Sequence, residues 1–351
     1  MRINKYLVFN IMLDLFKQDI QEFANSFELA DSISNSTFLI TGSTGLIGSS
    51  LVKCLLILHK NIKIVCPVRN LTKAFDMFSK QECDNIEFVE CDLSSFDFNT
   101  LGCVDYIIHC AAPTSSKFFV ERPVDTFTSI LNITHNLLTY ANNSRVKAFV
   151  YVSSVEVYGA IHDDSLTVTE DVQGYIDPMA VRSSYSMAKR AAENLCAVYA
   201  SQYKLPVMVA RLTQTTGANI SPNDNRYVAQ FCRLAAIGDD IILFSTGMSA
   251  KPICYTMDSV SAILYIMLKG ETGSAYNVAN EDTYISVKGL AEYLRDHFNP
   301  SITVKVEINE KMGYAPETKL RICTDKLKAL GWTPKYNLHS ILSRIISIYK
   351  K

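Results

Sequence analysis

Continuous apolar runs, rather than alternating ones, recur through the first two thirds of this sequence. The first of them, TFLIT, ends at Thr41. Strands buried on both faces of a parallel sheet have this pattern, whereas a strand with one solvated face alternates apolar and polar residues. Segments with a helical period separate the runs, so we predict an α/β fold built on a doubly wound parallel sheet. Further strands are predicted at 62–68, 86–91, 104–110, 147–153 and 207–211.

The segment before the first strand has a different pattern. Leu7, Ile11 and Leu15 recur at i, i+4 spacing, which predicts one face of a helix. Asn10 and Asp14 interrupt the apolar stretch, and no small-residue cleavage site follows, so a signal peptide is not expected. We predict a helical extension that packs on the main body or on a partner subunit.

The charge balance excludes some classes of partner. The 351 residues carry 34 Lys and Arg against 35 Asp and Glu, a formal net charge of -1. A chain without excess positive charge has no general attraction for nucleic acid or an anionic membrane. No apolar run approaches the roughly 20 residues that span a bilayer. Its 10 cysteines include no C-x-x-C pair, so we predict no metal site, reduced thiols and a cytoplasmic location.

A glycine-rich turn follows the first strand. Gly42, Gly45 and Gly48 lie in the segment TGSTGLIG, between a β-branched run and a helical pattern. Such glycines let the backbone approach a pyrophosphate, whose negative charge the helix N-terminus favours. A strand, this turn and a helix in succession predict a dinucleotide site of Rossmann type. The residues expected to contact the cofactor there are Gly42, Ser43, Thr44, Gly45, Leu46, Ile47 and Gly48.

Three parts of the chain follow from these patterns. Residues 1–35 are the helical extension, and residues 36–211 are predicted to be the NAD(P)-binding Rossmann domain. Residues 212–351 are predicted to form mainly a smaller C-terminal substrate lobe. Within them, 241–280 are expected to return in part to the Rossmann domain, because AYNVAN has the pattern of a late strand of the sheet.

Two residues bear on which cofactor binds. Arg69 follows the second strand, where NAD enzymes of this fold carry an acidic residue for the ribose 2′-hydroxyl. An arginine suits a 2′-phosphate instead, so either NAD or NADP is expected, with NADP favoured. Asp92 follows the third strand, where it is either a hydrogen-bond acceptor for adenine or an ordinary turn aspartate.

Tyr185 and Lys189 are spaced four residues apart in SSYSMAKRAAE, so they share one helix face. An ammonium near a phenol favours the phenolate and lowers the pKa of the tyrosine. The phenolate is then a base for a substrate hydroxyl, and Ser154, at the end of the fifth strand, is placed to hydrogen-bond the same oxygen.

The segments TGSTGLIG, HCAAPTS, YVSSVEVYG and YSMAK, in this order, resemble the extended short-chain dehydrogenase/reductases of the NAD-dependent epimerase/dehydratase family. The resemblance covers nearly everything after residue 36. It implies Ser154, Tyr185 and Lys189 as the catalytic triad and a nucleoside-diphosphate sugar as substrate. It implies a homodimer paired through helices near 123–142 and 184–203. It also implies further cofactor contacts at Leu93, Cys110, Ala111 and Ala112 and substrate contacts at Thr114 and Ser115.

Within the family, the segment EDVQGYIDPMAVRSSYSMAKR is similar to UDP-glucuronate decarboxylases, with 4,6-dehydratases and 4-epimerases next. Glu156 lies two residues after Ser154, so both are expected on one strand face. The resemblance implies that this glutamate assists after C4 is oxidised, although it could instead be a structural carboxylate paired with an arginine. Dehydratases carry an Asp-Glu pair where this chain has Val155 and Glu156, which weakens the dehydratase interpretation.

Other departures keep alternatives open. Lys251 stands where the family usually has an arginine that grips the substrate, and Gln214 replaces a common asparagine. Arg226, Arg233 and Arg321 are further candidates to hold a diphosphate. The leading hypothesis is an enzyme that oxidises C4 of the sugar and then decarboxylates, dehydrates or epimerises the ketone. The alternatives are an NADPH-dependent ketoreductase or dehydrogenase and, more remotely, a non-catalytic cofactor-binding protein.

Overall fold

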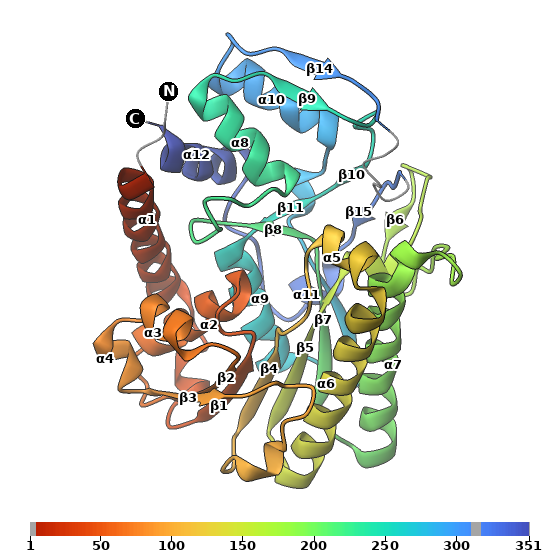
Figure 1. The fold of residues 1–351 in the computed structure, drawn as a ribbon. Helices are drawn as coiled ribbons and strands as arrows, with labels where there is room; N and C mark the ends of the chain where they lie inside the picture. The colour runs from red at the N-terminus through yellow and green to blue at the C-terminus, as the bar shows by residue number, and fades with distance from the viewer. Residues whose placement is uncertain (1–4, 310–316, 351) are drawn as a thin grey trace.

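Seven parallel strands form the central sheet of the computed structural model, which describes residues 5–309 and 317–350 (Figure 1). Their order is β3-β2-β1-β4-β5-β7-β12, and the winding reverses between β1 and β4. This arrangement confirms the predicted Rossmann-type α/β fold. The strands are β1 (Thr37–Thr41), β2 (Lys63–Val68), β3 (Ile86–Glu90), β4 (Tyr106–His109), β5 (Ala148–Ser154), β7 (Val207–Leu212) and β12 (Ala275–Val278).

Helices cover both faces of this sheet. On one face lie α6 (Pro123–Ser144) and α7 (Ser184–Tyr203), side by side (Figure 1). On the other lie α2 (Leu46–Ile57) and α9 (Thr256–Lys269). The continuous apolar runs follow from this layering, because alternate residues of a strand enter opposite cores.

Strand β1 shows the alternation directly. Phe38 and Ile40 pack in the core beneath α2 and α9, whereas Leu39 packs in the core beneath α6 and α7. All three side chains are fully buried. Both faces of the strand must therefore be apolar.

A smaller group of elements lies beyond the carboxyl ends of the strands (Figure 1). Its main helices are α8 (Tyr227–Ile237), α10 (Val287–Phe298) and α12 (Leu338–Tyr349). Its short strand pairs are β8 (Gln214–Thr216) with β11 (Ile253–Tyr255), β9 (Ile241–Leu243) with β14 (Val304–Val306), β10 (Ala250–Lys251) with β13 (Ile285–Ser286), and β6 (Thr167–Val168) with β15 (Arg321–Ile322). The remaining short helices are α3 (Leu71–Met77), α4 (Lys80–Cys83), α5 (Ser116–Glu121) and α11 (Asp325–Lys328).

The N-terminal extension is a long helix, α1 (Lys5–Ser26), that packs on the main body against α2, α9 and α12 (Figure 1). Its buried apolar stripe is Val8, Met12, Phe16, Ile20 and Phe23. The predicted stripe is therefore off by one position: Ile11 and Leu15 are half-buried at its flank, and the side chain of Leu7 lies outside the described residues. In the described part of the chain, α1 included, no helix combines the length and hydrophobicity that crossing a bilayer requires.

A buried polar network holds α1 to the C-terminal helix. Arg344 of α12 donates hydrogen bonds to Asp19 and, at 2.9 Å, to Glu22 of α1. The Tyr255 hydroxyl donates to Asp19 at 2.5 Å, and the Tyr336 hydroxyl donates to Glu22 at 2.8 Å. Asp19 is fully buried, and burial raises its pKa to about 6 despite the opposing charge of Arg344.

We expect Arg344→Leu to lower the free energy of unfolding by about 3 kcal/mol, because the substitution leaves a buried carboxylate without its cation. A carboxyl group whose pKa is raised on folding destabilises the fold as the pH rises. The loss should therefore be larger at pH 8 than at pH 5, where Asp19 holds a proton. Urea unfolding at both pH values measures it. The control Arg295→Leu, which removes the exposed pair with Asp296 at 2.7 Å, should cost little at either pH. Equal losses in the two variants would contradict this account of α1.

Candidate active site

The glycine-rich turn connects β1 to α2 at the carboxyl edge of the sheet. Gly42 has a φ of +70°, a conformation that favours glycine, and its carbonyl oxygen accepts the Gly45 amide hydrogen at 2.9 Å. A Cβ on Gly42 would lie 2.9 Å from the Ala111 amide nitrogen, and a Cβ on Gly48 would lie 2.2 Å from the Gly42 carbonyl oxygen. Side chains at these two positions would fill the turn. With glycine at both, the backbone packs closely and a phosphate can approach it.

The other expected cofactor residues surround this turn. Ser43 is buried and Thr44 half-buried within it, and Leu46 and Ile47 begin α2. Three half-buried residues come directly after β4, next to Gly42, namely Cys110, Ala111 and Ala112. The structure thus brings together two segments that are far apart in the sequence.

A residue that sequence patterns did not identify supports the first turn of α2. Asn219, from the loop after β8, donates to the Leu46 carbonyl oxygen at 3.1 Å.

Arg69 and Asp92 lie at the ends of neighbouring strands. Arg69 follows β2, is exposed and has no hydrogen-bond or ion-pair partner among residues 5–309 and 317–350. Asp92 is exposed after β3, where its carboxylate accepts the Ser94 amide hydrogen at 2.9 Å. Asp92 therefore makes the turn contact that was one of its two expected roles, and Leu93 beside it is buried.

Ser154, Tyr185 and Lys189 lie where β5 meets α7. Ser154 ends β5, and its hydroxyl lies close enough to the Tyr185 phenol to lower the pKa of that phenol. Lys189, one helical turn after Tyr185, is 3% exposed. Its ammonium donates to the Val152 carbonyl oxygen at 2.8 Å and lies 5.9 Å from the centre of the Tyr185 ring. The three predicted residues therefore occupy one junction of strand and helix.

The phenol of Tyr185 differs from the expectation in one respect. Burial, and then the negative charge of Glu156, raise its pKa above the usual range, while the Ser154 hydrogen bond and Arg182 oppose the rise. The Lys189 ammonium donates to the Val152 carbonyl oxygen, and the effect of burial on the Tyr185 pKa prevails over the lowering that the sequence predicted. A positive charge that enters the site would lower the pKa of Tyr185, which is the direction predicted from the sequence.

An aromatic ring covers this tyrosine. Phe119 of α5 stacks on Tyr185 with ring centres 4.3 Å apart and an angle of 10° between the planes. The Phe119 carbonyl oxygen accepts the Ser184 hydroxyl at 3.0 Å, and the Arg182 guanidinium lies 5.1 Å from the Phe119 ring centre. No sequence signal identified Phe119, since a phenylalanine in a short helix predicts only packing.

The expectation that Glu156 and Ser154 share one strand face is wrong, because β5 ends at Ser154 and Glu156 belongs to the short 3-10 helix Val155–Tyr158, where its amide donates to the Ser154 hydroxyl at 3.2 Å. One of its oxygens lies 3.4 Å from Arg182 and accepts the Ser186 hydroxyl at 3.3 Å. The pairing with an arginine is the alternative that the sequence left open. The negative charge of Glu156 also raises the pKa of Tyr185, so this carboxylate lies close to the predicted catalytic group.

Cations gather next to Glu156. Burial lowers the pKa of Lys251 in β10. The negative charge of Glu156 opposes this shift, whereas the positive charges of Arg182 and Arg226 add to it. Arg226 is paired with Asp224 at 2.7 Å, whereas the ammonium of Lys251 has no hydrogen-bond or ion-pair partner within the described ranges. A half-buried ammonium of this kind is suited to an anionic ligand.

The remaining substrate candidates are spread more widely. Gln214 begins β8, which pairs with β11, and it is half-buried. Thr114 and Ser115 are exposed before α5, after the loop that follows β4. Arg233 donates to the Pro222 carbonyl oxygen at 3.1 Å, and Arg321 pairs with Asp164 at 3.2 Å. These two arginines are engaged in contacts within the chain.

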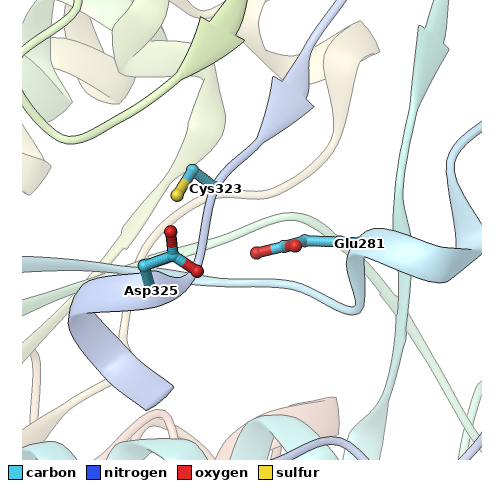
Figure 2. A group of neighbouring side chains, drawn as sticks. All are labelled: Glu281, Cys323 and Asp325. Atoms are coloured by element: carbon cyan, nitrogen blue, oxygen red, sulfur yellow. The ribbon is translucent and has the colours of Figure 1, made fainter. Parts of the chain in front are cut away.

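A separate group of possible metal ligands comprises Glu281, Cys323 and Asp325, whose ligating atoms lie within 4.8 Å of one another (Figure 2). Lys328 pairs with Glu281 at 3.0 Å, and the other oxygen of Glu281 accepts the Thr324 hydroxyl at 2.6 Å. The Glu281 charge is therefore already neutralised by the chain itself.

Comparison with known proteins agrees with this geometry. Residues 38–279 match the model of the "NAD dependent epimerase/dehydratase family". The chain belongs to this family. UDP-glucuronic acid decarboxylase 5 of Arabidopsis thaliana is 32% identical over 309 residues, which cover 87% of this chain and 86% of the relative.

Solved structures share the fold of this family member. A dTDP-glucose 4,6-dehydratase from Bacillus anthracis, in complex with NAD, has a TM-score of 0.74 and 21% identity and covers 90% of this chain and 96% of its own. The protein RMD from Pseudomonas aeruginosa, complexed with NADPH, has a TM-score of 0.72 and 22% identity and covers 90% of this chain and 99% of its own. The fold is thus compatible with either dinucleotide and does not decide between them.

We expect Gly48→Ala to weaken dinucleotide binding roughly tenfold or more, because the new Cβ must displace the Gly42 carbonyl and reshape the turn. Calorimetric titration with NAD and NADP measures Kd. Gly102→Ala is the matched control, since a Cβ there meets nothing within 4 Å. Circular dichroism confirms that both variants are folded, and unchanged binding in Gly48→Ala would refute the assignment of the turn.

Proposed function

We propose that this protein oxidises C4 of a nucleoside-diphosphate uronic acid and then decarboxylates the 4-keto intermediate, using a bound NAD(P). The observation that carries the proposal is the meeting of Ser154, Tyr185 and Lys189 at one junction of β5 and α7, with Glu156 held beside them by Arg182 and Ser186. The similarity to a UDP-glucuronic acid decarboxylase over most of the chain supports the same reaction.

The chain contains residues that fit the dinucleotide. The close-packed glycine turn would hold the pyrophosphate at the start of α2, and the segment Cys110–Ala112, which lies against Gly42, would line the cofactor site next to the turn. A bound nicotinamide supplies a reversible hydride acceptor and a positive charge near the phenol.

Tyr185 is the proposed general base at the C4 hydroxyl. Ser154 orients the shared hydrogen bond, and Lys189 places a positive charge beneath the ring. The phenol is held by Phe119 on one face, so its oxygen has little freedom to move. The residues of the junction therefore remove and return one proton at a fixed atom.

Glu156 and the neighbouring cations suit the second step. A ketone at C4 is β to the C5 carboxylate, so the C5–carboxylate bond can break with release of carbon dioxide while the electron pair passes to the ketone oxygen. The resulting enolate takes a proton at C5. In this step Arg182 pairs with the substrate carboxylate, and Lys251 pairs with the substrate diphosphate. Glu156 transfers the proton that C5 receives.

One observation favours a second candidate function. Arg69 is exposed and unpaired within the described residues, as expected for a group that binds a 2′-phosphate. NADP-dependent reduction of a keto sugar would use this preference, consuming the reduced cofactor stoichiometrically. The decarboxylase regenerates its cofactor internally, so the two functions differ in whether added NADPH is required.

We also propose that the protein is a homodimer. The paired helices α6 and α7 leave apolar side chains exposed on their outer surface, among them Val124, Val198 and Tyr203. A resemblance to the family, in which these helices pair two subunits, supports a subunit contact there.

The function is tested by incubating the purified protein with UDP-, dTDP-, GDP- and CDP-sugars, including the uronic acids, and following product mass. Loss of carbon dioxide supports the decarboxylase, whereas loss of water, an unchanged mass or strict dependence on NADPH supports a dehydratase, an epimerase or a reductase. Tyr185→Phe should lose turnover by a factor on the order of a thousand and remain folded. Near-normal turnover of this variant would exclude Tyr185 as the base.

We expect Arg69→Ser to weaken NADP binding on the order of tenfold, because a charge-assisted hydrogen bond contributes about 1.5–3 kcal/mol. NAD binding should change by no more than about twofold. Lys63→Ser, a cation at the opposite end of the same strand, is the control and should alter neither Kd. Tighter binding of NAD than NADP to the parent protein would refute the preference.

A further inference from the structure

A buried carboxylate lies one helical turn beyond Lys189. Glu193 of α7 accepts the Ser153 hydroxyl at 2.5 Å, and Ser153 is the neighbour of Ser154 in β5. Glu193 also pairs with Arg211 of β7, at 2.7 Å through one terminal nitrogen and at 3.1 and 3.2 Å through the Nε atom. The side chains of Glu193 and Arg211 are 11% and 10% exposed. One carboxylate thus joins the helix that carries Tyr185 to two strands of the sheet.

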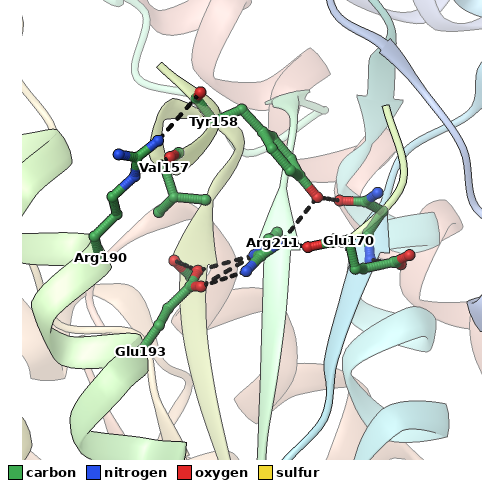
Figure 3. Close-up of polar contacts among 8 residues, drawn as sticks. Val157, Tyr158, Glu170, Arg190, Glu193 and Arg211 are labelled. Atoms are coloured by element: carbon green, nitrogen blue, oxygen red, sulfur yellow. Dashed lines mark hydrogen bonds and ion pairs between the residues drawn. The ribbon is translucent and has the colours of Figure 1, made fainter. Parts of the chain in front are cut away.

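Arg211 extends this connection to the segment that carries Glu156 (Figure 3). It donates to the Tyr158 hydroxyl at 3.0 Å and to the Glu170 carbonyl oxygen at 2.7 Å. Arg190, also on α7, donates to the Val157 carbonyl oxygen at 2.5 Å. The short helix after Ser154 is therefore fixed from both sides by contacts that begin on α7.

The same carboxylate is the acidic group that acts on Lys189. The ammonium is packed between α7, β4 and β5, where the titratable groups around it are Glu193, Tyr185 and Cys196 of α7, His109 and Cys110 at the end of β4, and Tyr151 of β5. Burial lowers the pKa of Lys189 to about 8, and Glu193 is the first of the charges that oppose this shift. Cys110 and Cys196 are buried thiols whose own pKa values are raised, so they are neutral near pH 7.

We propose that Glu193 is a positioning residue for the reaction: it holds the ends of β5 and β7 against α7 and is the buried counter-charge that keeps Lys189 protonated. The inference depends on the proposed function in one respect, namely that Lys189 takes part in turnover. The effect of the Glu193 charge on Lys189, one helical turn away, is independent of any substrate. Without Glu193, two buried cations, Lys189 and Arg211, would remain in the same interior with no carboxylate between them.

The effect of the Glu193 charge on Lys189 is tested on the protein alone by NMR titration of lysine labelled with carbon-13 at Cε, with the Lys189 signal assigned by its loss in Lys189→Met. The parent signal should titrate near pH 8, and Glu193→Gln should move the midpoint by about one unit toward acid. Ser153→Ala, which removes one support of the carboxylate, should move it in the same direction by less. An unchanged midpoint in folded Glu193→Gln would overturn the proposal.

The contribution to turnover is tested by the pH dependence of kcat. In Glu193→Gln the alkaline limb should move toward acid by the same amount, so kcat at pH 8 falls roughly fivefold and largely recovers at pH 6.5, with KM nearly constant. Glu82→Gln breaks the partly buried pair with Lys53 at 2.8 Å and should leave the limb in place. A lowered Lys189 midpoint with an unmoved kcat profile would refute the role in turnover. Full activity of Lys189→Met would instead refute the part that the proposed mechanism gives to Lys189 and leave the effect of Glu193 on the Lys189 charge intact.

Discussion

The burial of one ammonium group is the constraint on which this site depends. Lys189 lies almost fully inside the junction of α7 with β4 and β5, where an isolated charge would be costly. Its cost is offset by the Val152 carbonyl, by the ring faces of Tyr151 and Tyr185, and by Glu193 one turn along the helix. These same contacts fix the rotation of α7, and with it the direction of Tyr185.

The substrate side of the site requires the opposite, namely a positive charge that the chain does not neutralise and that an anionic ligand can. Arg182 and Arg226 have carboxylate partners within the chain, and Lys251 is half-buried beside them without one. The chain as a whole is nearly neutral, so no general field draws in a diphosphate. A few local cations at the carboxyl edge of the sheet would have to do so. The fixed junction and the adjacent cations together define the proposed reaction: a stationary base next to a binding site for two kinds of anion.

Local patterns predicted much of this arrangement. The strands lie within two residues of their predicted ends, because full burial on both faces demands continuous apolar runs. The glycine turn and the Tyr185–Lys189 spacing are equally local. Contacts between distant segments could not be predicted. Glu193 and Arg190 look like the solvated face of a helix, yet both point into the molecule. In α1 two stripes have the same i, i+4 spacing, and only the presence of α9 and α12 decides that Val8, Met12 and Phe16 face inward.

The central claim is that one site oxidises C4, loses a carboxylate through the ketone and restores C4 without outside reductant. NMR of the pentose product formed from UDP-glucuronic acid in deuterium oxide, with no added NADPH, tests it most directly. The account predicts deuterium at C5, where the enolate takes a solvent proton, and none at C4, where the original hydride returns. Deuterium at C4, a product without deuterium at C5, or no product until NADPH is supplied would contradict it.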